Sequence, residues 1–251
     1  MGPRIEPRAD LASKVLPGPL HDALRHVFGR IPDGCMLVGG TALAGFYFGH
    51  RRSDDMYLFT RDPMIQEVAI RAVASLRDLG AELQAVVHSP SCYRATVRWR
   101  KHAFTADVVC DPAHFKEGRS VRLPDGIVVA EIETLLMTKA ATLVSRCGEK
   151  DLYDLIFILD RFPDLTLERL LEMGRRIDGG MSAENVMLSV LGTQLQMQSC
   201  DFAIDPSLDR QAVYERILAF QKGLIKGLRA LAKKQPLPPL GALIKKIRKL
   251  Q

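Results

Sequence analysis

The sequence has 251 residues, of which 47% are apolar and 25% charged, a composition typical of soluble globular proteins. It contains no run of eighteen apolar residues and no N-terminal secretion signal, which argues against a membrane span or export. Five scattered cysteines without a CxxC pair argue against disulfides and zinc, and predict a cytoplasmic protein. The formal charge of +6 permits a nucleotide or nucleic-acid partner without requiring one.

Helices and strands are mixed in the first half of the chain. Proline and glycine punctuation, strand-like alternation and apolar periodicity predict these elements. The expected helices span residues 21–30, 39–49 and 63–79, and the expected strands span 35–38, 55–60, 83–88, 93–99 and 104–110. Arg100 and Lys101, between the last two strands, are expected to form a hairpin turn.

The pattern is helical in the second half. Expected helices span residues 131–145, 150–161, 167–177, 183–198, 208–233 and 240–250. The predicted fold is therefore α+β: an α/β domain at residues 1–125, with a small mixed sheet flanked by helices, and a helical domain at 126–251. We expect the helical domain to complete an active-site cleft.

The segment from Val38 to Thr60 carries the strongest indication of chemistry. Gly39, Gly40 and Thr41 follow a strand and open a helix, an arrangement suited to phosphate because glycine permits close approach and the helix N-terminus favours negative charge. A tight turn without a ligand gives the same pattern.

Two acidic positions are candidate metal ligands. Asp55 follows Ser53-Asp54 at the head of the next strand, where a carboxylate is well placed to hold Mg²⁺, although acids are also common in turns. Asp107 interrupts an otherwise apolar strand, Thr105 to Val109, which favours a functional role over a structural one.

Two stretches resemble the AbiEii/AbiGii-type nucleotidyltransferase toxins, a branch of the DNA polymerase beta-like superfamily. The run GGTAL…HRRSDDMYLF is similar to the first motif of that family, and ETLLMTKAATLVSRCGEKDLYDL, from Glu133 to Leu155, is similar to its second. The two motifs occur in the expected order and together cover roughly residues 36–160. The resemblance implies a polymerase beta-like core.

The resemblance also assigns roles. It implies that Gly39, Gly40, Thr41, Ser53 and Arg52 hold the nucleotide. Asp55 and Asp107 would bind Mg²⁺ or Mn²⁺. The family has Asp-x-Asp in the first motif, and Tyr57 replaces the second acid. Because a neutral phenol is a poor Mg²⁺ ligand, this replacement leaves open an inactive relative, an introduced inactivating change or a variant mechanism.

The second motif contributes a lysine and two acids. Lys139 projects from an apolar helix stripe, from which it would either reach solvent or enter a charged cleft. The resemblance favours contact with a triphosphate. Asp151 and Asp154 are three residues apart and share a helix face, and the resemblance implies that at least one acts as a base or as a lysine partner.

The predicted function is transfer of a nucleoside monophosphate from an NTP to a hydroxyl acceptor. The resemblance implies the toxin of a toxin–antitoxin or abortive-infection pair, with tRNA as an acceptor in some relatives and a cognate antitoxin as a partner. One alternative is a relative that binds nucleotide or RNA without turnover. Another is a small-molecule nucleotidyltransferase that modifies antibiotics.

Overall fold

The computed structural model describes residues 5–250 and divides into two compact units. We call residues 5–135 the α/β unit and residues 136–250 the helical unit. The division falls within helix α6 (Ile132–Ser145). The strand β7 (Val128–Ala130) belongs to the sheet of the α/β unit. The functional domain boundary between residues 125 and 126 stays a prediction.

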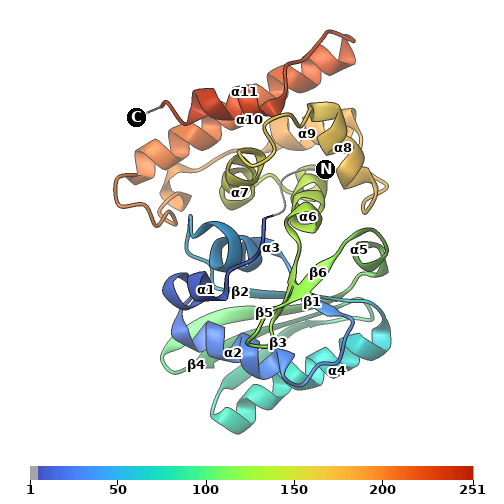
Figure 1. The fold of residues 1–251 in the computed structure, drawn as a ribbon, viewed down its shortest axis with the longest axis vertical. Coiled ribbons are helices and arrows are strands. Elements are labelled where there is room, and N and C mark those ends of the chain that lie inside the picture. The colour runs from blue at the N-terminus through green and yellow to red at the C-terminus, as the bar shows by residue number, and fades with distance from the viewer. Residues whose placement is uncertain (1–4, 251) are drawn as a thin grey trace. The chain divides into compact units, whose positions relative to one another are not determined.

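The α/β unit is built on a seven-stranded mixed sheet with the order β3-β4-β5-β2-β1-β7-β6 (Figure 1). Its remaining strands are β1 (Cys35–Leu37), β2 (Asp55–Thr60), β3 (Glu82–His88), β4 (Cys92–Trp99), β5 (His102–Cys110) and β6 (Ser120–Arg122). Strand β2 runs antiparallel to β1 and parallel to β5, and β4 runs antiparallel to β5. The predicted α+β class with a small mixed sheet is confirmed.

The two faces of this sheet differ because side chains alternate along each strand. On β2, the Tyr57 ring lies against Gly39, and Phe59 packs on His114 with ring centroids 4.4 Å apart. Met56 and Leu58 therefore point to the opposite face, which α2 (Gly18–Phe28) and α4 (Pro63–Ala74) cover in Figure 1. The neighbouring strands β1 and β7, toward one edge of the sheet, are buried along their whole length.

Local sequence signals explain where several helices begin. Helix α4 begins at Pro63, and the Asp62 side chain accepts a hydrogen bond from the Ile65 amide at 2.9 Å. Helix α5 (Pro112–Glu117) repeats this pattern with Asp111 as its cap. The remaining helical segments of this unit are α1 (Ala9–Val15), α3 (Gly39–Ala42) continued by a π-helix (Leu43–Phe48), and a 3₁₀ segment (Ser75–Leu79) after α4.

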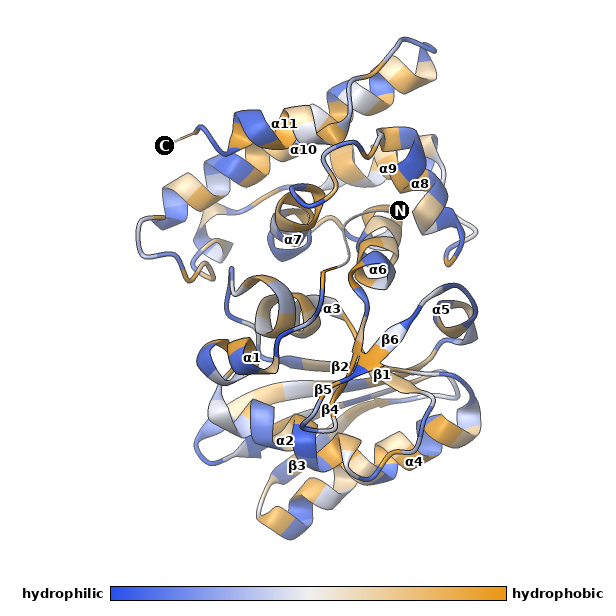
Figure 2. Ribbon diagram, viewed as in Figure 1, coloured by the Kyte–Doolittle hydropathy of each residue, from blue (hydrophilic) through white to orange (hydrophobic). Residues whose placement is uncertain are grey.

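The helical unit contains the rest of α6 and the helices that follow it. These are α7 (Glu149–Leu159), α8 (Leu167–Arg175), α9 (Ala183–Gly192), α10 (Arg210–Ala232) and α11 (Leu240–Ile247), with a 3₁₀ turn at Met197–Ser199. Polar and apolar residues alternate along α10 and α11 in Figure 2, as expected for helices with one packed face. The prediction that one helix covers 183–198 was wrong at its end, because α9 ends at Gly192 and the chain is extended at Thr193.

Within residues 5–250, no helix combines the length and the apolar character that crossing a bilayer requires.

Candidate nucleotide site

A glycine turn connects β1 to α3. Gly39 has φ +72°, a left-handed conformation that other residues rarely adopt, and a Cβ atom there would lie 3.3 Å from the Tyr57 ring. Val38 precedes the helix and gives it no side-chain cap, although its own N–H donates to the Tyr57 carbonyl at 2.9 Å. The first amides of α3 therefore receive no capping oxygen from that position, as a phosphate-binding helix start requires.

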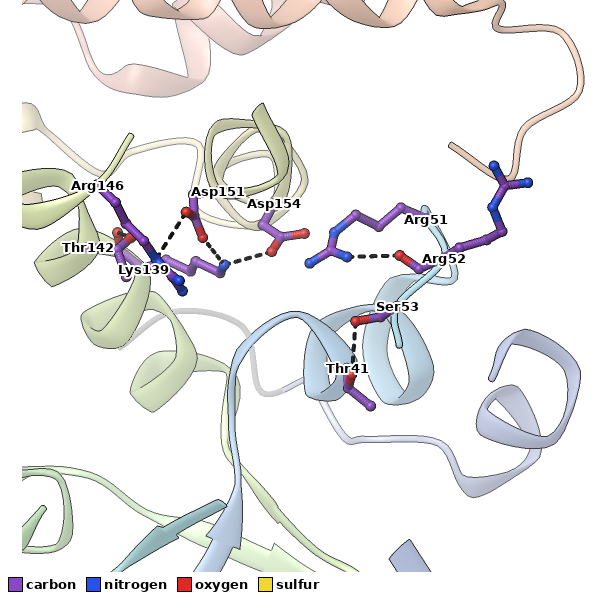
Figure 3. Close-up of polar contacts among 9 residues, drawn as sticks. All are labelled: Thr41, Arg51, Arg52, Ser53, Lys139, Thr142, Arg146, Asp151 and Asp154. Atoms are coloured by element: carbon purple, nitrogen blue, oxygen red, sulfur yellow. Dashed lines mark hydrogen bonds and ion pairs between the residues drawn. The ribbon is translucent and has the colours of Figure 1, made fainter. Parts of the chain in front are cut away.

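Arg51 lies directly on this turn. A Cβ atom at position 40 would lie 1.8 Å from Nη2 and 2.8 Å from Cζ of Arg51, so a side chain there would displace the guanidinium. The Arg51 residue is 3% exposed, and its Nη1 donates to the Arg52 carbonyl at 2.9 Å (Figure 3). A buried guanidinium thus lies at the start of α3, where it adds positive charge to that of the helix N-terminus.

The hydroxyl residues of the motif connect the turn to strand β2. The Thr41 and Ser53 hydroxyl oxygens are 2.8 Å apart, and Figure 3 shows this contact at the start of the helix. Thr41 also donates to the Asp55 backbone carbonyl. Both side chains are buried. These bonds hold the glycine turn against the head of β2, while direct contact of Thr41 or Ser53 with a phosphate stays a prediction.

The two predicted metal ligands lie on the same face of neighbouring strands. In the parallel register, Asp55 is opposite Thr105 and Tyr57 is opposite Asp107, so the two acids are diagonal neighbours. The exposed Asp55 carboxylate accepts a hydrogen bond from the Thr105 hydroxyl at 2.6 Å.

Asp107 is paired with an arginine. Strand β4 places Arg94 opposite Asp107, and Arg94 Nε lies 2.5 Å from Asp107 Oδ1. Asp107 is 6% exposed, whereas the Arg94 side chain is 49% exposed. The hydrogen bond and the charge of Asp107 raise the pKa of Arg94, so this guanidinium remains charged. Tyr57, Asp107 and Arg94 consequently form one row across β2, β5 and β4.

The donor set of this row does not fit a divalent cation. Mg²⁺ prefers several carboxylate or other oxygen ligands in octahedral geometry. Here the side chain beside Asp107 on β2 is the phenol of Tyr57, and Asp107 already accepts a bond from Arg94. Across residues 5–250, nowhere do three or more histidine, cysteine, aspartate or glutamate side chains gather as a metal site would require. Asp55 and Asp107 share a sheet face without forming such a cluster.

The second motif forms a buried charge cluster within the helical unit. Lys139 Nζ on α6 lies 2.6 Å from Asp151 Oδ1 and 2.8 Å from Asp154 Oδ2 on α7 (Figure 3). Lys139 is 4% exposed and Asp154 is fully buried, while Arg146 Nε approaches Asp151 Oδ2 at 3.4 Å. Asp151 and Asp154 are thus lysine partners. Contact between Lys139 and a triphosphate, and a catalytic role for either acid, stay predictions.

From the run His50-Arg51-Arg52, which could meet phosphates or be structural, the sequence led us to name Arg52 as the nucleotide ligand, and Arg94 was not considered. In the structure Arg52 is exposed, and its carbonyl oxygen supports Arg51. Arg94 could have been found by counting from the predicted hairpin turn at Arg100 and Lys101. That turn pairs Trp99 with His102. Five residues further from the turn on each strand, Arg94 lies opposite Asp107.

No protein-family model and no curated protein matches the sequence. Two solved structures are similar in fold. JHP933 from Helicobacter pylori is 16% identical, with 90% of this chain and 97% of that chain covered and a TM-score of 0.48. MenT4, a nucleotidyltransferase toxin from Mycobacterium tuberculosis, is 18% identical, with 95% of this chain and 94% of that chain covered and a TM-score of 0.49.

Proposed function

We propose that the α/β unit binds the phosphates of a nucleoside triphosphate at the glycine turn. The observation that carries this proposal is the Arg51 guanidinium packed on Gly40 at the start of α3. Helix N-termini attract anions through their free amides and dipole, and a guanidinium binds phosphate oxygens through paired N–H donors. Gly39 and Gly40 have no side chains of their own, which allows the Tyr57 ring and the Arg51 guanidinium to lie close to the backbone of the turn.

The reaction associated with this proposal is nucleotidyl transfer. The resemblance of both motifs to AbiEii/AbiGii-type toxins supports transfer of a nucleoside monophosphate to a hydroxyl, with release of pyrophosphate. As a transferase, the protein would be a toxin that depends on Mg²⁺ or Mn²⁺. It would have tRNA as its acceptor and a cognate antitoxin as its partner. An antibiotic as acceptor is the remaining transferase alternative.

Nucleotide binding without turnover is the second candidate, and the row on β2, β5 and β4 favours it. Metal ions in phosphoryl-transfer sites orient the triphosphate and neutralise developing charge. Tyr57 stands in place of one carboxylate of the Asp-x-Asp pattern, and the carboxylate of Asp107 is paired with Arg94. The geometry therefore supports phosphate binding best, with transfer slow or absent in the sequence as given.

Two measurements on the full chain test this. Calorimetric titration with each of the four NTPs should show binding, and Arg51→Gln should weaken it about tenfold or more, the value of one lost charge-assisted bond to phosphate. Incorporation of label from NTPs into tRNA and total RNA then separates the two candidates. If the chain binds no NTP, phosphate binding is excluded, whereas labelling by the unaltered chain excludes binding without turnover.

A further inference from the structure

Arg94 lies on the same sheet face as the glycine turn. The Tyr57 ring touches Gly39, Asp107 is opposite Tyr57 on the next strand, and Arg94 is opposite Asp107 on the strand beyond. Neighbouring strands are about 4.8 Å apart, so Arg94 begins roughly 10 Å across the sheet from Tyr57. A single row thus leads from the proposed phosphate turn to an arginine.

The charges of this row balance without a metal ion. The row contains one carboxylate, that of Asp107, one guanidinium, that of Arg94, and the phenol of Tyr57. The Asp-x-Asp pattern of the family would add a second carboxylate at position 57, and the excess negative charge would attract a divalent cation. Tyr57 and Arg94 therefore both make the row less attractive to a divalent cation. Tyr57 lacks the carboxylate of the Asp-x-Asp pattern, and Arg94 adds a positive charge.

Arg94 also has donors to spare. Its Nε bonds to Asp107, and within residues 5–250 that carboxylate is the only ion-pair partner of Arg94. The side chain is 49% exposed, so its terminal N–H groups are accessible to a ligand in solution. Guanidinium groups bind phosphate through such forked donors.

We propose that Arg94 takes the place of a divalent cation at Asp107, so that this chain binds nucleotide phosphates without Mg²⁺. The inference rests on the proposed function and adds two statements to it. Arg94 is a phosphate-binding residue, and Tyr57→Asp alone does not create a metal site because Arg94 still holds Asp107.

The first arm measures anion binding to the full chain with inorganic tripolyphosphate, which removes any dependence on the base. Titrations in EDTA and in Mg²⁺ should give the same affinity for the unaltered chain. Arg94→Gln should weaken binding about tenfold or more in EDTA. The matched control is Arg98→Gln, which makes the same charge change on an exposed arginine four residues along β4.

Arg94→Lys is a second variant for the case that Arg94→Gln does not fold. Lysine keeps a positive charge beside the buried Asp107 but loses the forked donors, so this variant should remain folded and still bind tripolyphosphate more weakly. Equal affinities for the unaltered chain, Arg94→Lys and Arg98→Gln would overturn the role of Arg94, as would binding that requires Mg²⁺.

The second arm measures metal binding directly, by Mn²⁺ paramagnetic resonance. Tyr57→Asp should bind no more Mn²⁺ than the unaltered chain, whereas Tyr57→Asp combined with Arg94→Gln should gain a site. The inference is wrong if the single variant gains the site, or if the double variant does not. Because this arm needs no nucleotide, it still tests Arg94 if tripolyphosphate fails to bind any variant, a result that would remove the proposed function instead.

Discussion

Gly40→Ala is the sharpest test of the contact between the glycine turn and Arg51. The new methyl carbon would lie 1.8 Å from Arg51 Nη2, far inside any allowed contact, so the guanidinium must move. Arg51 is 3% exposed, which leaves it little room to do so. The backbone of Gly40 does not have positive φ, so the substitution tests the steric contact and not strain.

The expected loss of stability is about 1–3 kcal/mol, the usual cost of overpacking a closely packed position. Trp99 reports this loss well, because it is the only tryptophan in the chain and is buried in the α/β unit, where its Nε1 donates to the Leu79 carbonyl at 3.1 Å. Urea unfolding followed by tryptophan fluorescence should therefore show a lower midpoint. Tripolyphosphate affinity should fall with it, because Arg51 is displaced from the turn.

Two control variants test whether the contact between Gly40 and Arg51 causes this loss of stability. Gly18→Ala introduces the same methyl group at a glycine with no atom within 4 Å of its Cβ position, so its midpoint should change little. In an Arg51→Ala background, Gly40→Ala should cost less than about 0.5 kcal/mol, because the two positions no longer interact. If Gly40→Ala behaves like Gly18→Ala, or costs the same with and without Arg51, the described contact is refuted.

Three further outcomes are expected. Lys139→Met removes the ammonium group that lies within 2.8 Å of both Asp151 and Asp154, and it should destabilise the helical unit by about 3–5 kcal/mol, measured by far-ultraviolet circular dichroism. Arg146→Gln removes a more exposed partner of Asp151 and should cost under about 1 kcal/mol. Lys101→Gly should stabilise the β4–β5 hairpin by about 0.5–1 kcal/mol, measured by Trp99 fluorescence, because Lys101 has φ 64°. Burial raises the pKa of the Cys147 thiol to about 12 from an unfolded value near 9, so stability should fall with pH across that interval, and less steeply in Cys147→Ala.

The strands that carry the site could be predicted because their sequences alternate. Residues 55–60 and 104–110 show the period of two, and both were found within two residues of their observed ends. Strands β6 and β7 could not be found in this way. Each has only three residues, and β7, unlike the equally short and buried β1, is not followed by a glycine pair that marks its end.

The two arginines illustrate different limits of sequence reasoning. Arg94 follows from a hairpin turn that the sequence does indicate, so its pairing with Asp107 was within reach. Arg51 was not, because its contact with Gly40 depends on how the π-helix returns the chain to the glycine turn. Nothing in the run His50-Arg51-Arg52 shows which of its arginines is buried.

The central claim is that the glycine turn holds nucleotide phosphates, and amide chemical shifts test it most directly. On addition of an NTP in EDTA, the backbone amides of Gly39, Gly40 and Thr41 should shift more than those of Gly18 and Gly192, which lie at a helix start and a helix end outside the proposed site. Binding that leaves the Gly39–Thr41 amides unchanged and shifts another region would contradict the account.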